Sequence, residues 1–155
     1  VAVVYAGFGG EAGQAGLADV LFGDVPASGR LAFTVYPEMW ENHTPMTDPS
    51  YQAGLGRSYK YLSPAVDPLF EFGAGLSYTT FALSVAAHAP SPIELGPVPD
   101  VVCVSVANTG GVPSPVVVTL FAVAINLVAP PRVIPNRKFI AFAKVPVALG
   151  ETVDA

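Results

Sequence analysis

The run Val101-Val102-Cys103-Val104-Ser105-Val106-Ala107, followed by Asn108-Thr109-Gly110-Gly111, decides the fold of the second half of the chain. Its first part is an apolar, partly alternating run, which is typical of a β-strand. Its second part collects the residues that favour tight turns, because Asn and Gly accept backbone conformations that other residues avoid. The pattern therefore predicts a strand that ends in a turn.

Short apolar runs of the same kind lie on both sides of this strand. They are Phe81–Val85, Val116–Val123 and Phe139–Val147, and the last is followed by a turn at Leu149–Glu151. Short strands at this spacing indicate an immunoglobulin-like or fibronectin-like β-sandwich over residues 78–155. A complete sandwich has about seven strands, so we expect this one to be incomplete at its C-terminal end.

The beginning of the chain follows a different pattern. Val1–Ala6 is a continuous apolar run, typical of a strand buried on both faces. After a turn at Gly7–Gly10, Glu11–Phe22 has helical spacing, with an acidic first turn and Gly23 in the stop position. Leu31–Tyr36 is a second apolar run. This strand, helix, strand order predicts an α/β domain with a largely parallel sheet.

Residues 37–77 are rich in proline and tyrosine and show no clear periodicity. A loop of this length inside a compact domain tends to be functional or to wrap another surface. We therefore expect two domains: residues 1–77 as the α/β part with a long wrapping loop, and residues 78–155 as the sandwich.

The composition restricts the classes of partner. Hydrophobic residues make up 52% of the chain and charged residues 12%, against about 25% charged in a typical soluble domain. So few charges suggest that much of the surface is normally covered. The net charge is −5, and no basic cluster exceeds Arg137-Lys138. This excludes an electrostatic footprint for nucleic acid or for an anionic membrane, and no apolar run reaches the length of a membrane helix.

Few residues suggest metal or thiol chemistry. Cys103 is the single cysteine, so no intrachain disulfide can form, and its apolar run predicts a buried structural thiol. His43 and His88 lack metal-ligand spacing. Asn42 begins a formal glycosylation sequon, which Pro45 directly after it makes less favourable.

Three motifs in order carry a family resemblance. The first is Phe8–Gln14 with Ala18–Asp24 and Ser28-Gly29-Arg30-Leu31, the second is Met46-Thr47-Asp48 with Gly56–Tyr61, and the third is Phe70–Phe81. Together with Asn108-Thr109-Gly110 and Pro135–Val145, they resemble the C-terminal part of family 3 glycoside hydrolases of the β-xylosidase or β-glucosidase type. The resemblance covers nearly the whole chain.

This resemblance implies the end of a flavodoxin-like α/β sandwich domain, followed by a fibronectin type III-like domain, with truncation expected at both ends. The parent enzyme would hydrolyse O-glycosyl bonds of β-linked xylosides, arabinosides or glucosides, with oligosaccharides or aryl glycosides as substrates. The chain would contact a (β/α)8 barrel that it does not itself contain. The family implies no cofactor, and an extracellular, cell-wall or vacuolar location.

The resemblance gives this chain no catalytic residue and no metal site. Retaining glycosidases use two carboxyl groups about 5–5.5 Å apart, and the family's nucleophile and acid/base lie upstream of the segment matched here. The candidates for the border of a substrate cleft are Glu11, Asp48 and Arg57, with Asp24, Glu38 and Glu41 as further loop carboxylates. For Arg57, a role in tying down its loop is the alternative.

Two other functions stay open. One is a non-catalytic carbohydrate-binding or protein-interaction module. The other is a cofactor-binding α/β protein, because Gly7, Gly9 and Ala12 match the dinucleotide fingerprint. The proline-rich loop that follows, in place of a second strand and helix unit, argues against it. The isolated segment is expected to be inactive.

Overall fold

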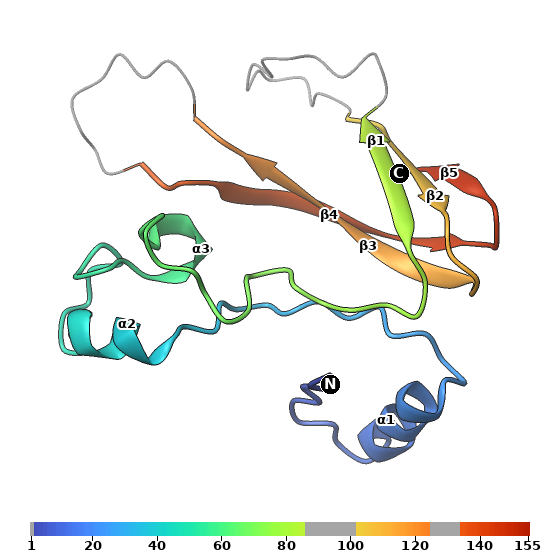
Figure 1. Cartoon of the computed structure of the whole chain (residues 1–155), viewed down its shortest axis with the longest axis horizontal. Helices are drawn as coiled ribbons and strands as arrows, with labels where there is room; N and C mark the ends of the chain where they lie inside the picture. Colours follow the sequence, from blue (N-terminus) through green and yellow to red (C-terminus); the bar gives the residue numbers. More distant parts are fainter. Residues whose placement is uncertain (1, 86–101, 125–133) are drawn as a thin grey trace. The chain divides into compact units, whose positions relative to one another are not determined.

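The computed structural model describes residues 2–85, 102–124 and 134–155. Within them the helices are α1 (Gly13–Phe22), α2 (Glu38–His43) and α3 (Ser58–Tyr61). The strands are β1 (Phe81–Val85), β2 (Val104–Asn108), β3 (Ser114–Ala122), β4 (Lys138–Val147) and β5 (Thr152–Asp154) (Figure 1). The chain forms two compact units. The first unit is Val1–Ser28, Leu76–Val116 and Val145–Ala155, and the second is Gly29–Gly75 and Val117–Lys144.

The first unit contains a three-stranded antiparallel sheet in the order β1-β2-β5, whose strands lie side by side in Figure 1. Val106 of β2 pairs with Leu83 of β1 and Val153 of β5 and is completely buried. β3 and β4 form a separate two-stranded sheet. All four predicted strands are therefore confirmed within the described residues, although Val101 lies outside them. The short strand β5 follows the predicted turn, and sequence reasoning did not foresee it.

Helix α1 confirms the predicted helix and its stop. Gly23 has a left-handed φ of 88°, and its N–H binds the carbonyl oxygens of Asp19 and Val20, the usual end of a helix at glycine. The predicted beginning was wrong. The helix starts at Gly13, so Glu11 lies in the preceding turn and no acidic residue occupies the first turn. The physical reason is Gly10, whose φ of +59° breaks the helical path.

The predicted strand at Val1–Ala6 is not formed in its described part. Residues 2–6 have no strand assignment, and Val3 and Tyr5 are 76% and 65% exposed. A strand needs a neighbour to satisfy its backbone N–H and C=O groups, and residues 2–6 pair with no strand of the described chain. An apolar run thus indicates the tendency to form a strand, whereas a partner strand is needed to form one.

Leu31–Tyr36 also fails to form the predicted strand of a parallel sheet. Val35 instead makes an isolated antiparallel bridge with Phe70. The Leu31 N–H binds the Ala74 carbonyl at 2.9 Å, and the Gly73 N–H binds the Leu31 carbonyl at 2.8 Å. Extended backbone over residues 31–35 therefore lies along residues 70–74, because their backbone groups satisfy each other. Two sequence motifs are joined in this way.

The prediction of a buried Cys103 was wrong, because the thiol is exposed. Side chains alternate between the two faces of a strand. In β2, Val106 and Asn108 face inward and are buried, whereas Ser105 binds Asp154 at the surface. Cys103 shares its parity with Ser105, so the register of β2 directs it away from the core.

The second unit has its own small core of Trp40, Leu62 and Val66, with Tyr36 and Leu55 packed against it. The Trp40 ring stacks on Tyr36 with centroids 4.1 Å apart. Its Nε1–H donates to the Gly56 carbonyl at 2.7 Å. The long loop predicted for residues 37–77 is therefore a compact folded segment with two short helices.

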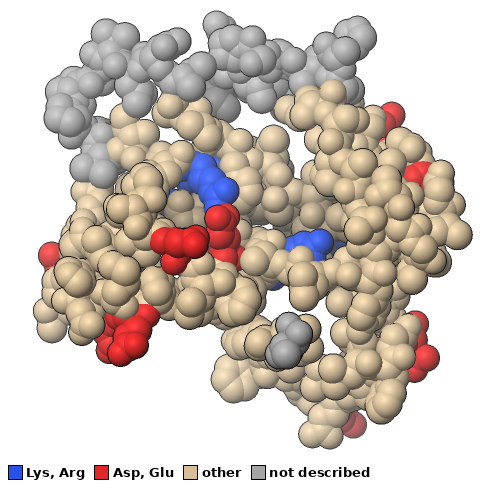
Figure 2. Space-filling model, viewed as in Figure 1, with Lys and Arg blue, Asp and Glu red and all other residues tan. Residues whose placement is uncertain are grey.

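Much of the described surface is apolar and uncharged. Figure 2 shows one face on which acidic and basic residues are few. Phe8 is fully exposed, and Phe22, Met46 and Leu76 are at least 71% exposed. Apolar surface of this extent usually marks contacts, in keeping with the low charge of the sequence. Among the described residues, none of the helices combines the length and apolar character needed to cross a membrane.

Candidate functional site

Asp48 and Arg57 come together in the second unit, as members of one folded loop. The Arg57 guanidinium donates to the backbone carbonyls of Asp48 and Pro45. Its backbone N–H binds the Tyr51 carbonyl at 2.8 Å. The Asp48 carboxylate accepts from the Ser50 N–H at 2.8 Å, a local turn contact. Arg57 therefore clamps the segment that carries the Met46-Thr47-Asp48 motif, and it does so through backbone groups.

Ser58, next to the clamp, has an unusual backbone. Its φ of 56° is the one positive value among the described non-glycine residues, and such conformations cost of order 1–3 kcal/mol. The Ser58 N–H donates to the Tyr36 hydroxyl at 2.6 Å. Tyr36 also stacks on Trp40, so the small core fixes the strained residue. Sequence reasoning did not find this support, because it joins positions 22 residues apart.

Glu11 lies in the first unit, exposed, in the turn before α1. Its carboxylate makes no hydrogen bond or ion pair with the described residues. Asp24, Glu38 and Glu41 are exposed as well, but the prediction that Glu38 and Glu41 lie in a loop was wrong, because both belong to helix α2. These groups have the accessibility that a cleft border requires.

A broad hollow in the second unit is lined by charged, polar and aromatic side chains. It has a cavity volume of about 660 Å³. Arg137 at its edge forms an ion pair with Glu71, with 3.0 Å between Nη2 and Oε2. The same guanidinium lies over the Phe121 ring, 4.8 Å from its centroid, a favourable cation–π distance. Arg137 and Glu71 are 66 residues apart in sequence, so no local motif could have found them.

Aromatic rings form a wall of this hollow. Tyr59 and Phe72 both line it, and their ring centroids are 4.4 Å apart. Phe121 and Phe139 pack edge-on against Phe72 at 6.1 and 5.8 Å. The Tyr59 hydroxyl accepts from the Phe139 N–H at 3.3 Å. This cluster links the third family motif to the Pro135–Val145 segment and holds the wall rigid.

Four further polar residues line the hollow, namely Thr34, Ser63, Asp67 and Asn136. Asn136 is fixed at both ends, since its N–H binds the Lys60 carbonyl at 2.6 Å and its Nδ2 donates to the Leu62 carbonyl at 2.8 Å. Asp67 is exposed and has no ionic partner among the described residues. The Thr34 Oγ1 atom is buried without a hydrogen-bond partner in the described chain, which is uncommon for a buried hydroxyl.

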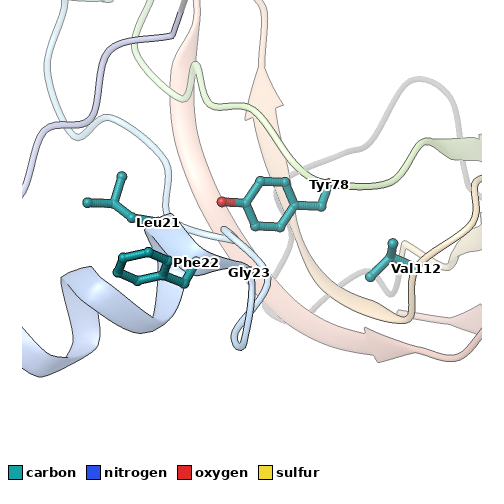
Figure 3. Close-up of a pocket in the computed structure, with 5 residues that line it drawn as sticks. All are labelled: Leu21, Phe22, Gly23, Tyr78 and Val112. Carbon is teal, nitrogen blue, oxygen red and sulfur yellow. The ribbon is translucent and has the colours of Figure 1, made fainter.

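The first unit has a smaller apolar hollow of about 330 Å³ at the end of α1. Figure 3 shows Tyr78 pointing toward the helix end, with Phe22 and Leu21 on one side and Val112 on the other. The Tyr78 hydroxyl donates to the Val20 carbonyl in the last turn of α1, which also accepts from the Gly23 N–H. Tyr78 therefore anchors α1, and the hollow offers no further polar group from a side chain.

The structure also bears on metal binding and on the glycosylation sequon at Asn42. The described residues hold no group of three or more His, Cys, Asp or Glu side chains that could bind a metal ion, and His88 lies outside them. Asn42 of the sequon is exposed in α2. The hydroxyl of Thr44, however, is buried and accepts from the Leu55 N–H at 3.1 Å, so the folded sequon does not offer its threonine to an enzyme.

Comparison with known proteins gives the family. A model of the glycosyl hydrolase family 3 C-terminal domain matches residues 1–78, half of the chain. The chain belongs to glycosyl hydrolase family 3. The exo-1,4-beta-xylosidase of Emericella nidulans is 36% identical over 156 residues, which cover 92% of this chain and 20% of that protein. The beta-xylosidase/alpha-L-arabinofuranosidase 1 of Medicago sativa is 39% identical over 38% of this chain and 8% of its own length.

Solved structures agree with this family assignment. A family 3 exo-beta-xylosidase in complex with a xylobiose aziridine probe matches 94% of the chain at 25% identity and a TM-score of 0.73, over 21% of its own length. The beta-glucosidase of Chaetomella raphigera matches 97% of the chain at 27% identity and a TM-score of 0.72, over 23% of its length. The chain thus spans about a fifth of the length of the Emericella nidulans xylosidase and of the two solved enzymes.

Proposed function

We propose that this chain is the C-terminal part of a glycosidase that hydrolyses O-glycosyl bonds of β-linked xylosides, arabinosides or glucosides. The observation that carries the proposal is the 36% identity with an exo-1,4-beta-xylosidase over 92% of the chain. Matches to a beta-xylosidase/alpha-L-arabinofuranosidase and to beta-glucosidases support the same range of sugars. Oligosaccharides or aryl glycosides would then be substrates of the whole enzyme.

The finer domain assignment belongs to the same proposal. Residues 1–77 would end a flavodoxin-like α/β sandwich, and residues 78–155 would form a fibronectin type III-like domain. Helix α1 supports this assignment, because it buries none of its residues within the described chain although it carries Leu21 and Phe22. An apolar helix of this kind needs a partner surface. The remainder of the α/β domain and the (β/α)8 barrel of the family are the proposed partners.

The chain's own contribution to the site would be to border the substrate cleft and not to perform the chemistry. Hydrolysis with retention needs a carboxylate nucleophile and an acid/base about 5–5.5 Å apart. The family resemblance places both of these groups upstream of the segment that this chain matches. We therefore assign Glu11, Asp48 and Arg57 to the border of the cleft, with Arg57 acting through the loop that it clamps.

Two assays test this function. The purified chain should release no nitrophenol from p-nitrophenyl β-xyloside or p-nitrophenyl β-glucoside, and clear turnover would contradict the absence of the catalytic pair. The xylosidase of Emericella nidulans, with its matching segment replaced by this chain, should keep hydrolysing the xyloside. A hybrid that melts cooperatively at the temperature of the parent enzyme but has no activity would refute the assignment. The unchanged parent enzyme is the control.

A further inference from the structure

We propose that the hollow of the second unit is a binding site for a neutral sugar, such as one or two pyranose units of an oligosaccharide. This role is additional to the proposed glycosidase assignment and does not require turnover by the chain. It rests on four properties of the hollow: its size, its charge, its aromatic wall and its fixed polar groups.

The size suits a small ligand. Binding sites for small molecules commonly have volumes of about 300–1,000 Å³, and the hollow has about 660 Å³. Its lining comes from two stretches of the second unit, residues 34–72 and Asn136-Arg137. All of its described lining residues therefore belong to one unit.

The charge of the lining favours a neutral ligand. Asp67 and Glu71 give two negative charges and Arg137 one positive charge, so the formal sum is −1. The Arg137 guanidinium is already paired with Glu71 at 3.0 Å. A phosphate or carboxylate ligand would have to compete with Glu71 for the arginine and would meet Asp67 as a like charge. Hydroxyl groups face no such penalty, because they can donate to the carboxylates and accept from the guanidinium.

The aromatic wall supplies the apolar half of sugar recognition. Tyr59 and Phe72 line the hollow and are only partly buried. The C–H faces of a pyranose ring are apolar and can cover such rings. Packing of Phe72 against Phe121 and Phe139 holds the wall in place, so little side-chain freedom is left to lose on binding.

The polar groups are fixed before a ligand arrives. The Arg137 guanidinium contacts both the Phe121 ring and the Glu71 carboxylate. Asn136 donates two hydrogen bonds, one to the Lys60 carbonyl and one to the Leu62 carbonyl. The side chains of Arg137 and Glu71 are still 36% and 62% exposed, which leaves them accessible. The Thr34 hydroxyl is the buried group without a partner in the described chain, and a ligand hydroxyl or a water carried with it would complete its hydrogen bonding.

Isothermal titration of the full chain with xylobiose, cellobiose and inorganic phosphate tests the proposal. We expect saturable binding of at least one disaccharide and none of phosphate. Glu71→Gln should weaken sugar binding about tenfold or more, since it replaces a charged hydrogen-bond acceptor. Glu151→Gln, the same change in the exposed turn before β5 and outside the hollow, should leave the affinity unchanged.

The emission of Trp40, the single tryptophan, reports whether each variant keeps the core of the second unit. If Glu71→Gln loses this core, Thr34→Val serves as the second variant, because it removes only the unpartnered hydroxyl. A loss of affinity in Thr34→Val with Trp40 emission unchanged supports the site. The proposal is wrong if neither disaccharide binds, if phosphate binds instead, or if the folded hollow variants bind like the wild-type chain. Failure of binding would leave the glycosidase assignment untouched, because that depends on turnover by the hybrid enzyme.

Discussion

Gly54 is the position at which a single methyl group should do most damage to the candidate site loop. Its φ is +58°, and a Cβ atom there would overlap the carbonyl oxygen of His43. The left-handed backbone alone costs an alanine about 1–2 kcal/mol. Displacing the neighbouring backbone adds about 1–3 kcal/mol, the usual cost of overpacking. Gly54→Ala should therefore destabilise the second unit by about 2–5 kcal/mol.

Gly73→Ala is the matched control. Gly73 belongs to the same unit and has a φ of +86°, but a Cβ atom there meets nothing within 4 Å. Gly73→Ala should therefore lower the stability of the unit only through its left-handed backbone, by about 1–2 kcal/mol. Both variants share the smaller entropy of the unfolded alanine chain, so the difference between them isolates the overlap with the His43 carbonyl.

Urea unfolding followed by Trp40 fluorescence measures this difference. Trp40 is 8% exposed and bound to the Gly56 carbonyl, so its emission follows the core next to the loop. With an m-value of about 2 kcal/mol/M, the midpoint should fall by roughly 1–2.5 M for Gly54→Ala and by roughly 0.5–1 M for Gly73→Ala. Equal shifts in the two variants would refute the steric reasoning, and so would a larger shift for Gly73→Ala.

Three other predictions concern the sheet, the clamp and the helix. Asn108→Ala removes the acceptor of the Gly110 N–H at 3.1 Å and the donor to the Val112 carbonyl at 2.9 Å; it should cost about 2–4 kcal/mol, seen as an earlier circular dichroism transition, and an unchanged transition would contradict this role. Arg57→Ala frees residues 45–51 from the clamp and should speed chymotrypsin cleavage of that segment severalfold, with Arg57→Lys intermediate; equal cleavage of the wild-type and alanine chains would rule the clamp out. Gly16→Ala, inside α1 with nothing near its Cβ position, should stabilise the helix by about 0.5–1 kcal/mol, and a lower melting temperature would show a hidden contact.

Local patterns in the sequence were enough for helix α1, for the strands β1 to β4 and for the family. The Phe81–Val85 strand, the strand before Asn108-Thr109-Gly110 and the helix ending at Gly23 follow from periodicity and from the backbone freedom of glycine. These properties act over a few residues and need no distant partner. The ordered motifs indicated the family for the same reason, since each is a local turn or packing signature.

Contacts between residues far apart in the sequence decided which predicted strands formed and which side chains meet. Residues 2–6 and 31–36 carry the composition of strands, yet their outcome depended on which backbone groups lay opposite them. Cys103 is apolar in context, and only the register of β2 assigned it to the outer face. The pairing of Arg137 with Glu71 joins segments 66 residues apart, and the unpartnered Thr34 hydroxyl is defined only by its surroundings. Sequence therefore determined which elements this chain can form, whereas tertiary structure decided which side chains meet, because a contact energy exists only once the chain has brought both partners together.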